Sequence, residues 1–342
     1  MLRSAIRLLA AGTIAVAFAG SAAAQNQADW DKVIAEAKKE GKVSLYTSTL
    51  GAPFHLDIIK AFQAKYGITI ELLDVRASEL DERIRTEQAS GRYNADVVQH
   101  GSASLLTTYD RPGILQARGT VPNQKNLGTL FAEGASDTRI PSYVLPYGIL
   151  INTDLVKGAD EPKSWKDLLN PKWKGKIVSD DFRALGGGSV FFSVTEDKLG
   201  KDFHEKLSQQ GIIFSRDVGN DERRVAAGEY PMRIPQLASN TLRMKGLPIK
   251  LVIPEEGMTF VRFDLGILKG APHPNAAKLL TDFYLSPEAQ LIYANAGMGS
   301  VINGVGEKVT SDAKAFAGAK FLGTNNPDTL NAQLDRAKAL YK

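Results

Sequence analysis

Residues 43–66 read VSLYTSTLGAPFHLDIIKAFQAKY and contain one complete strand–loop–helix unit. Residues 43–46 have the apolar pattern of a short strand, a Ser/Thr-rich loop follows, and residues 54–66 have the period of an amphipathic helix. Similar units begin with strands at residues 68–75 and 95–98. Strands that alternate with helices in this way predict an α/β fold with parallel or mixed sheets.

The loops that follow these three strands are candidates for a ligand site. In open α/β sheets, ligands lie at the carboxyl ends of the strands, where helix starts present unpaired backbone N–H groups. Ser78 and Asp81 also resemble a capping box at the start of a helix. The residues expected at this edge of the sheet are Ser48, Thr49, Arg76, Ser78, Gly101 and Ser102.

A second set of units follows residue 143 and contains a glycine-rich helix start. A strand at residues 176–178 precedes Asp181 and Arg183, and an apolar helix then opens with Gly187, Gly188 and Ser189. Consecutive glycines let the backbone approach a ligand with its N–H groups forward. A flexible turn would use the same glycines, so they support a binding loop and a turn equally.

The first 24 residues predict a secretory signal. Two arginines precede an apolar run of about a dozen residues, and the small residues Ala22 to Ala24 suit a signal peptidase. The apolar run is too short to span a bilayer, which takes about twenty residues. The chain has no cysteine, so a lipidated cysteine, disulfides and thiolate metal ligands are excluded. Cleavage near Ala24 and the absence of an anchor predict a soluble protein of a Gram-negative periplasm.

Length and charge limit the architecture and the partners. Without residues 1–24 the 342-residue chain has 342 − 24 = 318 residues, which suggests two domains. Its formal net charge is +4, and loss of Arg3 and Arg7 with the signal would lower this to +2. The basic residues are interspersed with acids and form no cluster, so we expect no nucleic-acid partner.

Nearly the whole mature chain resembles the periplasmic solute-binding proteins of ATP-driven importers, in the branch that binds ferric ion, thiamine, phosphonates and sugar phosphates. The order and spacing of several short motifs together carry the resemblance. These motifs are VSLYTS (43–48), ADVV (95–98), PYG (146–148), NTDL (152–155), PKSWKDLL (162–169), PKWKGKI (171–177), AAGEYP (226–231), PNAAK (274–278) and LSPEAQ (285–290).

The resemblance implies two α/β lobes with mixed sheets, joined by crossing strands and closing over a ligand in the cleft between them. It implies a first lobe of residues 25–130 and 263–301, a second lobe of residues 139–261 and 302–342, and a hinge at residues 131–138 and 262. It also implies a tail helix near residues 330–340, a membrane permease as partner, and a monomer. Binding of this kind needs no catalytic residue and no cofactor.

The expected ligand is a small oxyanion: an organophosphate, a phosphonate or a carboxylate. Arginine offers a planar fork that matches such groups, and serines with helix-start amides donate further hydrogen bonds. Ser48, Thr49, Arg76, Ser78, Gly101 and Ser102 would hold the ligand on the first lobe. Asp181, Arg183, Gly187, Gly188 and Ser189 would close from the second lobe, with Arg233 and Arg262 near the crossing strands. Each arginine alone is equally compatible with a surface or salt-bridged role, and Tyr147 with either a cleft wall or a packed hinge residue.

Ferric ion is the alternative ligand. Ferric binders of this branch use two adjacent tyrosines after a motif like Gly228 to Pro231, because a hard trivalent cation favours anionic oxygen ligands. Here Gln236 and Leu237 stand at that place. A metal site would need other tyrosines, such as Tyr143 or Tyr147, so the prediction contains no metal.

An enzyme acting on a small anion in the periplasm is the hypothesis from another class. The chain has no P-loop, no His-Glu-x-x-His and no Gly-x-Ser-x-Gly elbow. We expect the four histidines to be surface or packing residues. Among the paired acids, we expect Asp221-Glu222 and Glu255-Glu256 to be solvated or capping, and Asp181 to face the cleft. No catalytic residue is predicted.

Overall fold

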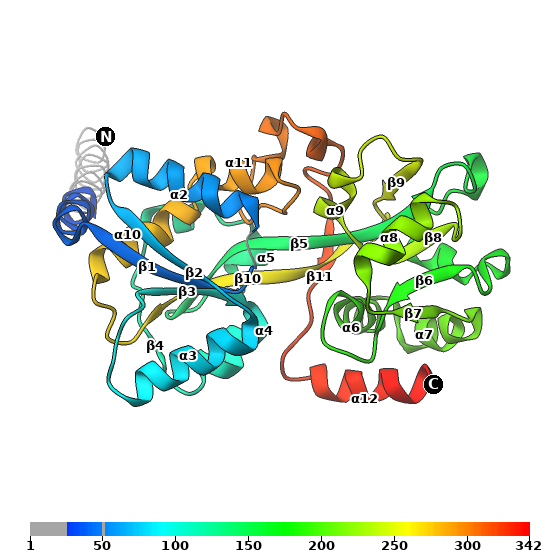
Figure 1. Cartoon of the computed structure of the whole chain (residues 1–342), viewed down its shortest axis with the longest axis horizontal. Coiled ribbons are helices and arrows are strands. Elements are labelled where there is room, and N and C mark those ends of the chain that lie inside the picture. The colour runs from blue at the N-terminus through cyan, green and yellow to red at the C-terminus, as the bar shows by residue number, and fades with distance from the viewer. Residues whose placement is uncertain (1–25, 50–51) are drawn as a thin grey trace, which may run out of the picture.

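The structure is a computed structural model, and it describes residues 26–49 and 52–342. Two α/β lobes lie side by side, joined by two long strands that run through both (Figure 1). This arrangement confirms the predicted two-lobed α/β fold. The predicted secretory signal, residues 1–24, lies outside the described residues.

The strands form one mixed sheet in the order β2-β1-β3-β10-β5-β8-β6-β7, with β4, β9 and β11 paired at its sides. Pairing is parallel among β1, β2 and β3 and again among β6, β7 and β8. The strands are β1 (Lys42–Thr47), β2 (Thr69–Asp74), β3 (Val97–Gly101), β4 (Leu115–Gln116), β5 (Arg139–Asn152), β6 (Ile177–Asp180), β7 (Ile213–Ser215), β8 (Met232–Leu237), β9 (Ile249–Val252), β10 (Met258–Leu268) and β11 (Phe321–Gly323).

Helices cover the sheet in both lobes, beginning with a helix at residues 26–40. The others are α2 (Pro53–Tyr66), α3 (Ala77–Ala89), α4 (Ser102–Ser104), α5 (Thr129–Ala132), α6 (Gly187–Leu199), α7 (Lys201–Leu207), α8 (Val218–Ala226), α9 (Ala238–Arg243), α10 (Pro274–Tyr284), α11 (Pro287–Asn295) and α12 (Leu330–Leu340). A π-helical turn, η1 (Leu105–Asp110), follows α4. Short 3₁₀ turns lie at Pro122–Asn126, Gly158–Asp160, Trp165–Leu169, Pro171–Trp173, Ser208–Gln210, Gly306–Lys308 and Asp312–Ala315.

The two crossing strands are β5 and β10. They pair antiparallel, from Arg139 opposite Gly266 to Tyr147 opposite Thr259. On the first-lobe side β10 pairs with β3, and on the second-lobe side β5 pairs with β8. Because most of β5 is buried, its sequence is a nearly continuous apolar run rather than an alternating one.

Each lobe has its own hydrophobic core. In the first lobe, the rings of Phe54 and Tyr143 lie 5.5 Å apart and those of Tyr143 and Tyr293 4.6 Å apart, between α2, β5 and α11. In the second lobe, Phe191 of α6 packs 4.9 Å from Trp165 and 5.2 Å from Phe182. The aromatic side chains of α6 therefore belong to the core, as their helical spacing predicts.

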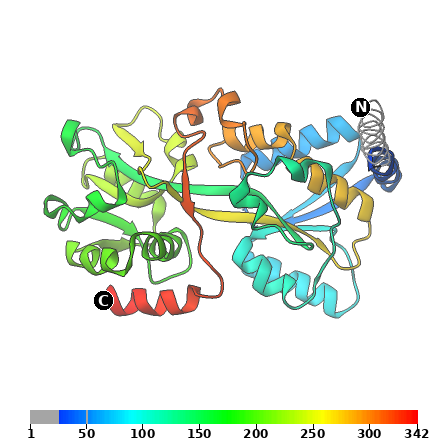
Figure 2. The ribbon, with the colours of Figure 1, turned by 180° about the vertical axis from the view of Figure 1, so that it is seen from behind.

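The C-terminal part of the chain visits both lobes. Ile302, Val305 and Val309 pack in the first-lobe core, so the packing favours a first lobe that continues well beyond residue 301, where the sequence suggests a boundary. The chain then pairs through β11 with the start of β10 and descends behind the interlobe gap to α12, which packs on α6 (Figure 2). Gln333 of α12 donates a 2.9 Å hydrogen bond to Asp197 of α6.

In the part of the chain that the structure describes, none of the helices combines the length and the apolar character needed to cross a bilayer.

Candidate functional site

A cavity of about 450 Å³ lies between the two lobes, below the crossing strand β10. The first lobe contributes α4 and η1, the second lobe contributes the start of α6, and the segment before α12 closes the back (Figures 1 and 2). Its lining residues are Gly101, Ser102, Ala103, Ser104, Thr107, Leu185, Gly186, Ser189, Val190, Val261, Arg262, Asn325, Pro327, Leu330 and Asn331. The volume is within the range of small-molecule sites.

Four of the predicted site residues meet in this cavity. Gly101 ends β3 and Ser102 begins α4, while Ser189 lies in the first turn of α6 and Arg262 lies on β10. The topology explains the meeting, because β3 pairs with β10 and both approach the gap that α6 faces from the other lobe. Gly101, Ser102 and Ser189 lie at a strand end or a helix start, as expected, and Arg262 lies in the middle of a crossing strand.

Hydroxyl and amide groups dominate the polar part of the lining. Ser102, Ser104 and Thr107 come from the first lobe, and Asn325 and Asn331 come from the C-terminal segment. Ser189 donates a 3.0 Å hydrogen bond to the Gly186 carbonyl oxygen. No carboxylate and no histidine lines the cavity, so it offers neither a general base nor a nucleophile–base pair.

Arg262 is the one charged residue of the lining. Its Nε and Nη2 donate hydrogen bonds of 2.7 and 2.9 Å to the fully buried Asp264. Asp264 also accepts from Arg139 at 3.1 Å, and Arg139 bonds to Asp110 at 2.8 Å. Burial raises the pKa of Asp264, and the two arginines act in the opposite direction. Two cations and two carboxylates thus balance in this network, which holds Arg262 at the cavity wall.

The first turn of α6 is packed tightly against the strand before it. The Gly188 N–H donates a 2.9 Å hydrogen bond to Asp180, and a Cβ at Gly187 would lie 2.9 Å from the Tyr147 ring. A Cβ at Gly188 would lie 2.7 Å from the carbonyl oxygen of Asp181. These two glycines are required by packing, and the cavity lining contains neither them nor Tyr147. Tyr147 is half-buried on β5, which is compatible with both roles considered for it, so its role stays a prediction.

Asp181 and Arg183 are placed differently from the prediction. Arg183 Nε donates to Asp181 at 2.8 Å, and Arg216 donates to the other Asp181 oxygen at 3.0 Å. Arg183 also donates a 3.1 Å bond to the carbonyl oxygen of Tyr341, beyond the far end of α12. Burial raises the pKa of Asp181, but the contacts with Arg183 and Arg216 outweigh it, so the pKa is lowered overall. The two residues form a structural ion pair, and Asp180 is the acid that meets the helix start.

Arg233 lies inside the second lobe, where it is 1% exposed. It donates to the Pro235 carbonyl oxygen at 2.5 Å and to Gln236 at 3.1 Å, and burial lowers its pKa. The nearby carboxylates of Asp180, Asp221 and Glu222 oppose this shift. Arg233 therefore neutralises a buried group of acids, and the prediction that it reaches the ligand is not supported by its position.

The expectation that Asp221 and Glu222 are solvated or capping is wrong. They are 0% and 7% exposed, and Glu222 accepts hydrogen bonds from Gln236 at 2.8 Å and Asn240 at 2.7 Å. The helical spacing could have indicated this burial, because Val225 lies three to four residues further along the same helix, on the same face, and is also buried. Burial raises the pKa of Asp221.

The remaining first-lobe candidates do not line the cavity. Thr49 is engaged with Asp74, to which its backbone N–H and its hydroxyl donate at 2.8 and 3.0 Å. Ser48, just before it, is partly exposed. Arg76 and Ser78 are exposed at the start of α3, where Arg76 itself is the N-cap and the predicted capping box does not form. Whether these four residues contact a ligand stays a prediction.

The tyrosines that a ferric site would need, Tyr143 and Tyr147, are buried or half-buried. Tyr143 and Tyr147 lie on β5, and burial raises the pKa of each phenol, which disfavours the anionic form. The described residues contain no group of three or more histidine and carboxylate side chains that could hold a metal ion. His55 and His204 are buried and pack against Phe54 and Phe192, at ring distances of 4.5 and 4.2 Å.

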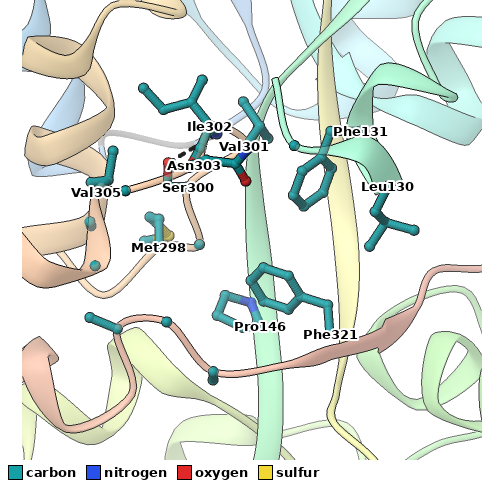
Figure 3. Close-up of a pocket in the computed structure, with 18 of the residues that line it drawn as sticks. Leu130, Phe131, Pro146, Met298, Ser300, Val301, Ile302, Asn303, Val305 and Phe321 are labelled. Carbon is teal, nitrogen blue, oxygen red and sulfur yellow. Dashed lines mark hydrogen bonds between the residues drawn. The ribbon is translucent and has the colours of Figure 1, made fainter. Parts of the chain in front are cut away.

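A second cavity, of about 330 Å³, lies behind the crossing strands (Figure 3). Phe131, Pro146 and Phe321 face it from one side, and Met298, Val301 and Val305 from the other. None of the predicted site residues lines it. No charged residue lines it and the Ser300 hydroxyl is already bonded to Gln290, whereas Arg262 lines the interlobe cavity. The interlobe cavity is therefore the better candidate for an anionic solute.

Comparison with known proteins identifies a family. A family model described as bacterial extracellular solute-binding protein matches residues 46–291. A putative 2-aminoethylphosphonate-binding periplasmic protein of Salmonella paratyphi A is 26% identical over 247 residues, which cover 67% of this chain and 68% of that protein. An uncharacterised protein of Haemophilus influenzae is 31% identical over 134 residues, and this match spans only 39% of its length and 38% of this chain.

Among solved structures, a Trichodesmium protein in complex with iron and citrate superposes with a TM-score of 0.72 at 22% identity. The match covers 88% of this chain and 98% of that one. At this identity the likeness shows the fold alone.

Proposed function

Because the chain belongs to the family of bacterial extracellular solute-binding proteins, we propose that it captures a small solute in the periplasm and delivers it to the membrane permease of an ATP-driven importer. The family match covers residues from β1 of the first lobe to α11, and therefore both crossing strands. The protein binds its solute and returns it chemically unchanged. The absence of carboxylates and histidines from the cavity lining supports a binding role over an enzymatic one.

The observation that carries the proposal is that the cavity is built jointly by the two lobes. First-lobe residues such as Ser102 and second-lobe residues such as Ser189 face the same space. A solute that contacts both walls stabilises the arrangement in which the lobes lie close together, and a ligand shifts such an equilibrium by its differential affinity for the two states. This coupling of binding to shape is what a permease can recognise.

The solute that we propose is a small phosphonate or carboxylate. Arg262 is the only charged side chain in the lining, and serine, threonine and asparagine side chains surround it. A cation with several hydrogen-bond donors suits an oxyanion. The similarity to a protein named for 2-aminoethylphosphonate binding supports the same class. The pairing of Arg262 with Asp264 predicts moderate rather than extreme affinity, because the arginine charge is already shared.

A thermal-unfolding screen tests this proposal. Protein freed of ligand by unfolding and refolding is heated with phosphate, 2-aminoethylphosphonate, ethylphosphonate, small carboxylates or ferric citrate. A ligand at about a hundred times its Kd adds about 2.7 kcal/mol, which raises the Tm by several degrees. We expect stabilisation by a phosphonate or a carboxylate without iron. Stabilisation by ferric citrate alone, with none by citrate, would replace the oxyanion proposal with a ferric one.

A further inference from the structure

The chain between β11 and α12, residues 324–329, crosses behind the interlobe cavity, and we call it the strap (Figure 2). Its downstream end is anchored on the second lobe, whereas its upstream end joins β11, which contacts both lobes through Phe321 and Leu322. Upstream, β11 pairs with the start of β10, and the Met258 N–H donates to the Lys320 carbonyl oxygen at 2.8 Å. Downstream, α12 packs on α6 and is held by the ion pairs of Arg336 with Glu196 and Glu205. The downstream end of the strap, which includes Asp328, therefore moves with the second lobe.

One ion pair joins the strap to the first lobe. Arg111, which follows η1, pairs with Asp328 of the strap. Among the described residues, no other ion pair or hydrogen bond connects residues 324–329 with the first lobe. The side chains of Arg111 and Asp328 are 51% and 66% exposed, so this ion pair lies on the surface and is accessible to solvent.

The strap is also part of the cavity wall. Asn325 and Pro327 line the cavity, together with Ser104 and Thr107, which lie on the same first-lobe stretch as Arg111. A movement that separates this stretch from α6 would pull Arg111 away from Asp328 and open the back of the cavity.

We propose that the strap is a latch between the lobes, and that the Arg111–Asp328 pair sets how readily the cavity opens. An exposed ion pair contributes about 0–1 kcal/mol, which corresponds to a change of up to about fivefold in the ratio of closed to open molecules. A contact of this strength biases the equilibrium without locking it, because each opening can break the pair. The inference goes beyond the proposed function, on which it rests only in taking the lobes to move.

Distance measurements between spin labels test the latch on protein without ligand. Since the chain has no cysteine, Lys60→Cys on α2 and Lys166→Cys in the second lobe give two unique labelling sites on exposed positions. Pulsed electron–electron double resonance then measures the distribution of distances between the two labels. We expect R111E and D328R each to raise the open-to-closed ratio by about two- to fivefold, and the double swap R111E/D328R to restore the original distribution.

The control is K206E, which reverses one charge of an equally exposed ion pair within α7, Lys206–Asp202. It should leave the distance distribution unchanged, and urea unfolding should show that all variants are folded. Single variants whose distributions match that of the unmodified protein would overturn the latch, and so would a double swap that fails to restore it. Because no ligand is present, failure of the latch is distinguishable from failure of the proposed function, which would appear as an absence of ligand stabilisation.

Discussion

Gly188→Ala should destabilise the second lobe by about 2–4 kcal/mol. The added Cβ would lie 2.7 Å from the Asp181 carbonyl oxygen and 2.9 Å from that of Asp180, and neither backbone atom can move as a side-chain tip would. Overpacking of this kind costs about 1–3 kcal/mol. A shift of the helix start would also weaken the hydrogen bond from Gly188 N–H to the Asp180 carboxylate, worth about 1.5–3 kcal/mol. The higher helix propensity of alanine returns at most about 1 kcal/mol.

Urea unfolding followed by tryptophan fluorescence measures this effect, because Trp165 and Trp173 are buried in the second-lobe core beside α6. Gly101→Ala is the matched control. Gly101 has φ −53° and ψ 132°, and a Cβ there would meet nothing within 4 Å, so stability should change by less than about 1 kcal/mol. A Gly188→Ala protein within about 1 kcal/mol of the unmodified protein would refute the packing role and return this glycine to the group of predicted ligand contacts.

Two further predictions concern the ion network and the pH. Asp264→Asn leaves Arg262 and Arg139 without their shared buried carboxylate and should lower the free energy of unfolding by about 3–5 kcal/mol. Urea unfolding should show this as a lower midpoint with an unchanged slope. A loss under about 1 kcal/mol would mean that the network contributes little to stability. Burial lowers the pKa of His204 to about 3, against about 6.5 in the unfolded chain, so the unfolded state binds more protons between these values and stability falls as the pH drops below about 6.5. The slope of unfolding free energy against pH that His204 contributes approaches about 1.4 kcal/mol per pH unit. His204→Gln should remove this contribution when urea unfolding at pH 5 is compared with unfolding at pH 7. An unchanged pH dependence in the variant would show that the histidine is protonated in the folded protein.

The sequence predicts the fold well because its periodic patterns are local. The strand–loop–helix unit at residues 43–66 appears as β1 and α2, and the apolar helix expected to open with Gly187 and Gly188 is α6. The continuation of the first-lobe core through Val305 could not be read from periodicity, because it depends on which surface remains open for a long tail to cover.

The site was harder to predict because an arginine has the same appearance in sequence whether it binds a ligand or an internal acid. Arg262 lies at the cavity, whereas Arg183 is held by Asp181, and Arg233 is buried in the second lobe and bonded to Pro235 and Gln236. Only the three-dimensional pairing distinguishes these cases. Asn325 and Asn331 lie far along the chain from the predicted loops and carry no motif, and only the path of the chain behind the gap brings them to the cavity.

The claim that an oxyanion binds between the lobes is tested most directly by calorimetric titration with 2-aminoethylphosphonate. The titration uses ligand-stripped protein in its unmodified form and in the variants Arg262→Gln and Arg183→Gln. Arg262 lines the cavity and Arg183 does not, although both were expected at the ligand. If an oxyanion binds between the lobes, Arg262→Gln should weaken binding at least tenfold, and Arg183→Gln should leave the Kd within about twofold. Loss of binding in Arg183→Gln with full binding in Arg262→Gln would place the solute elsewhere, and an absence of heat in every form, with ethylphosphonate and small carboxylates as well, would contradict the oxyanion claim.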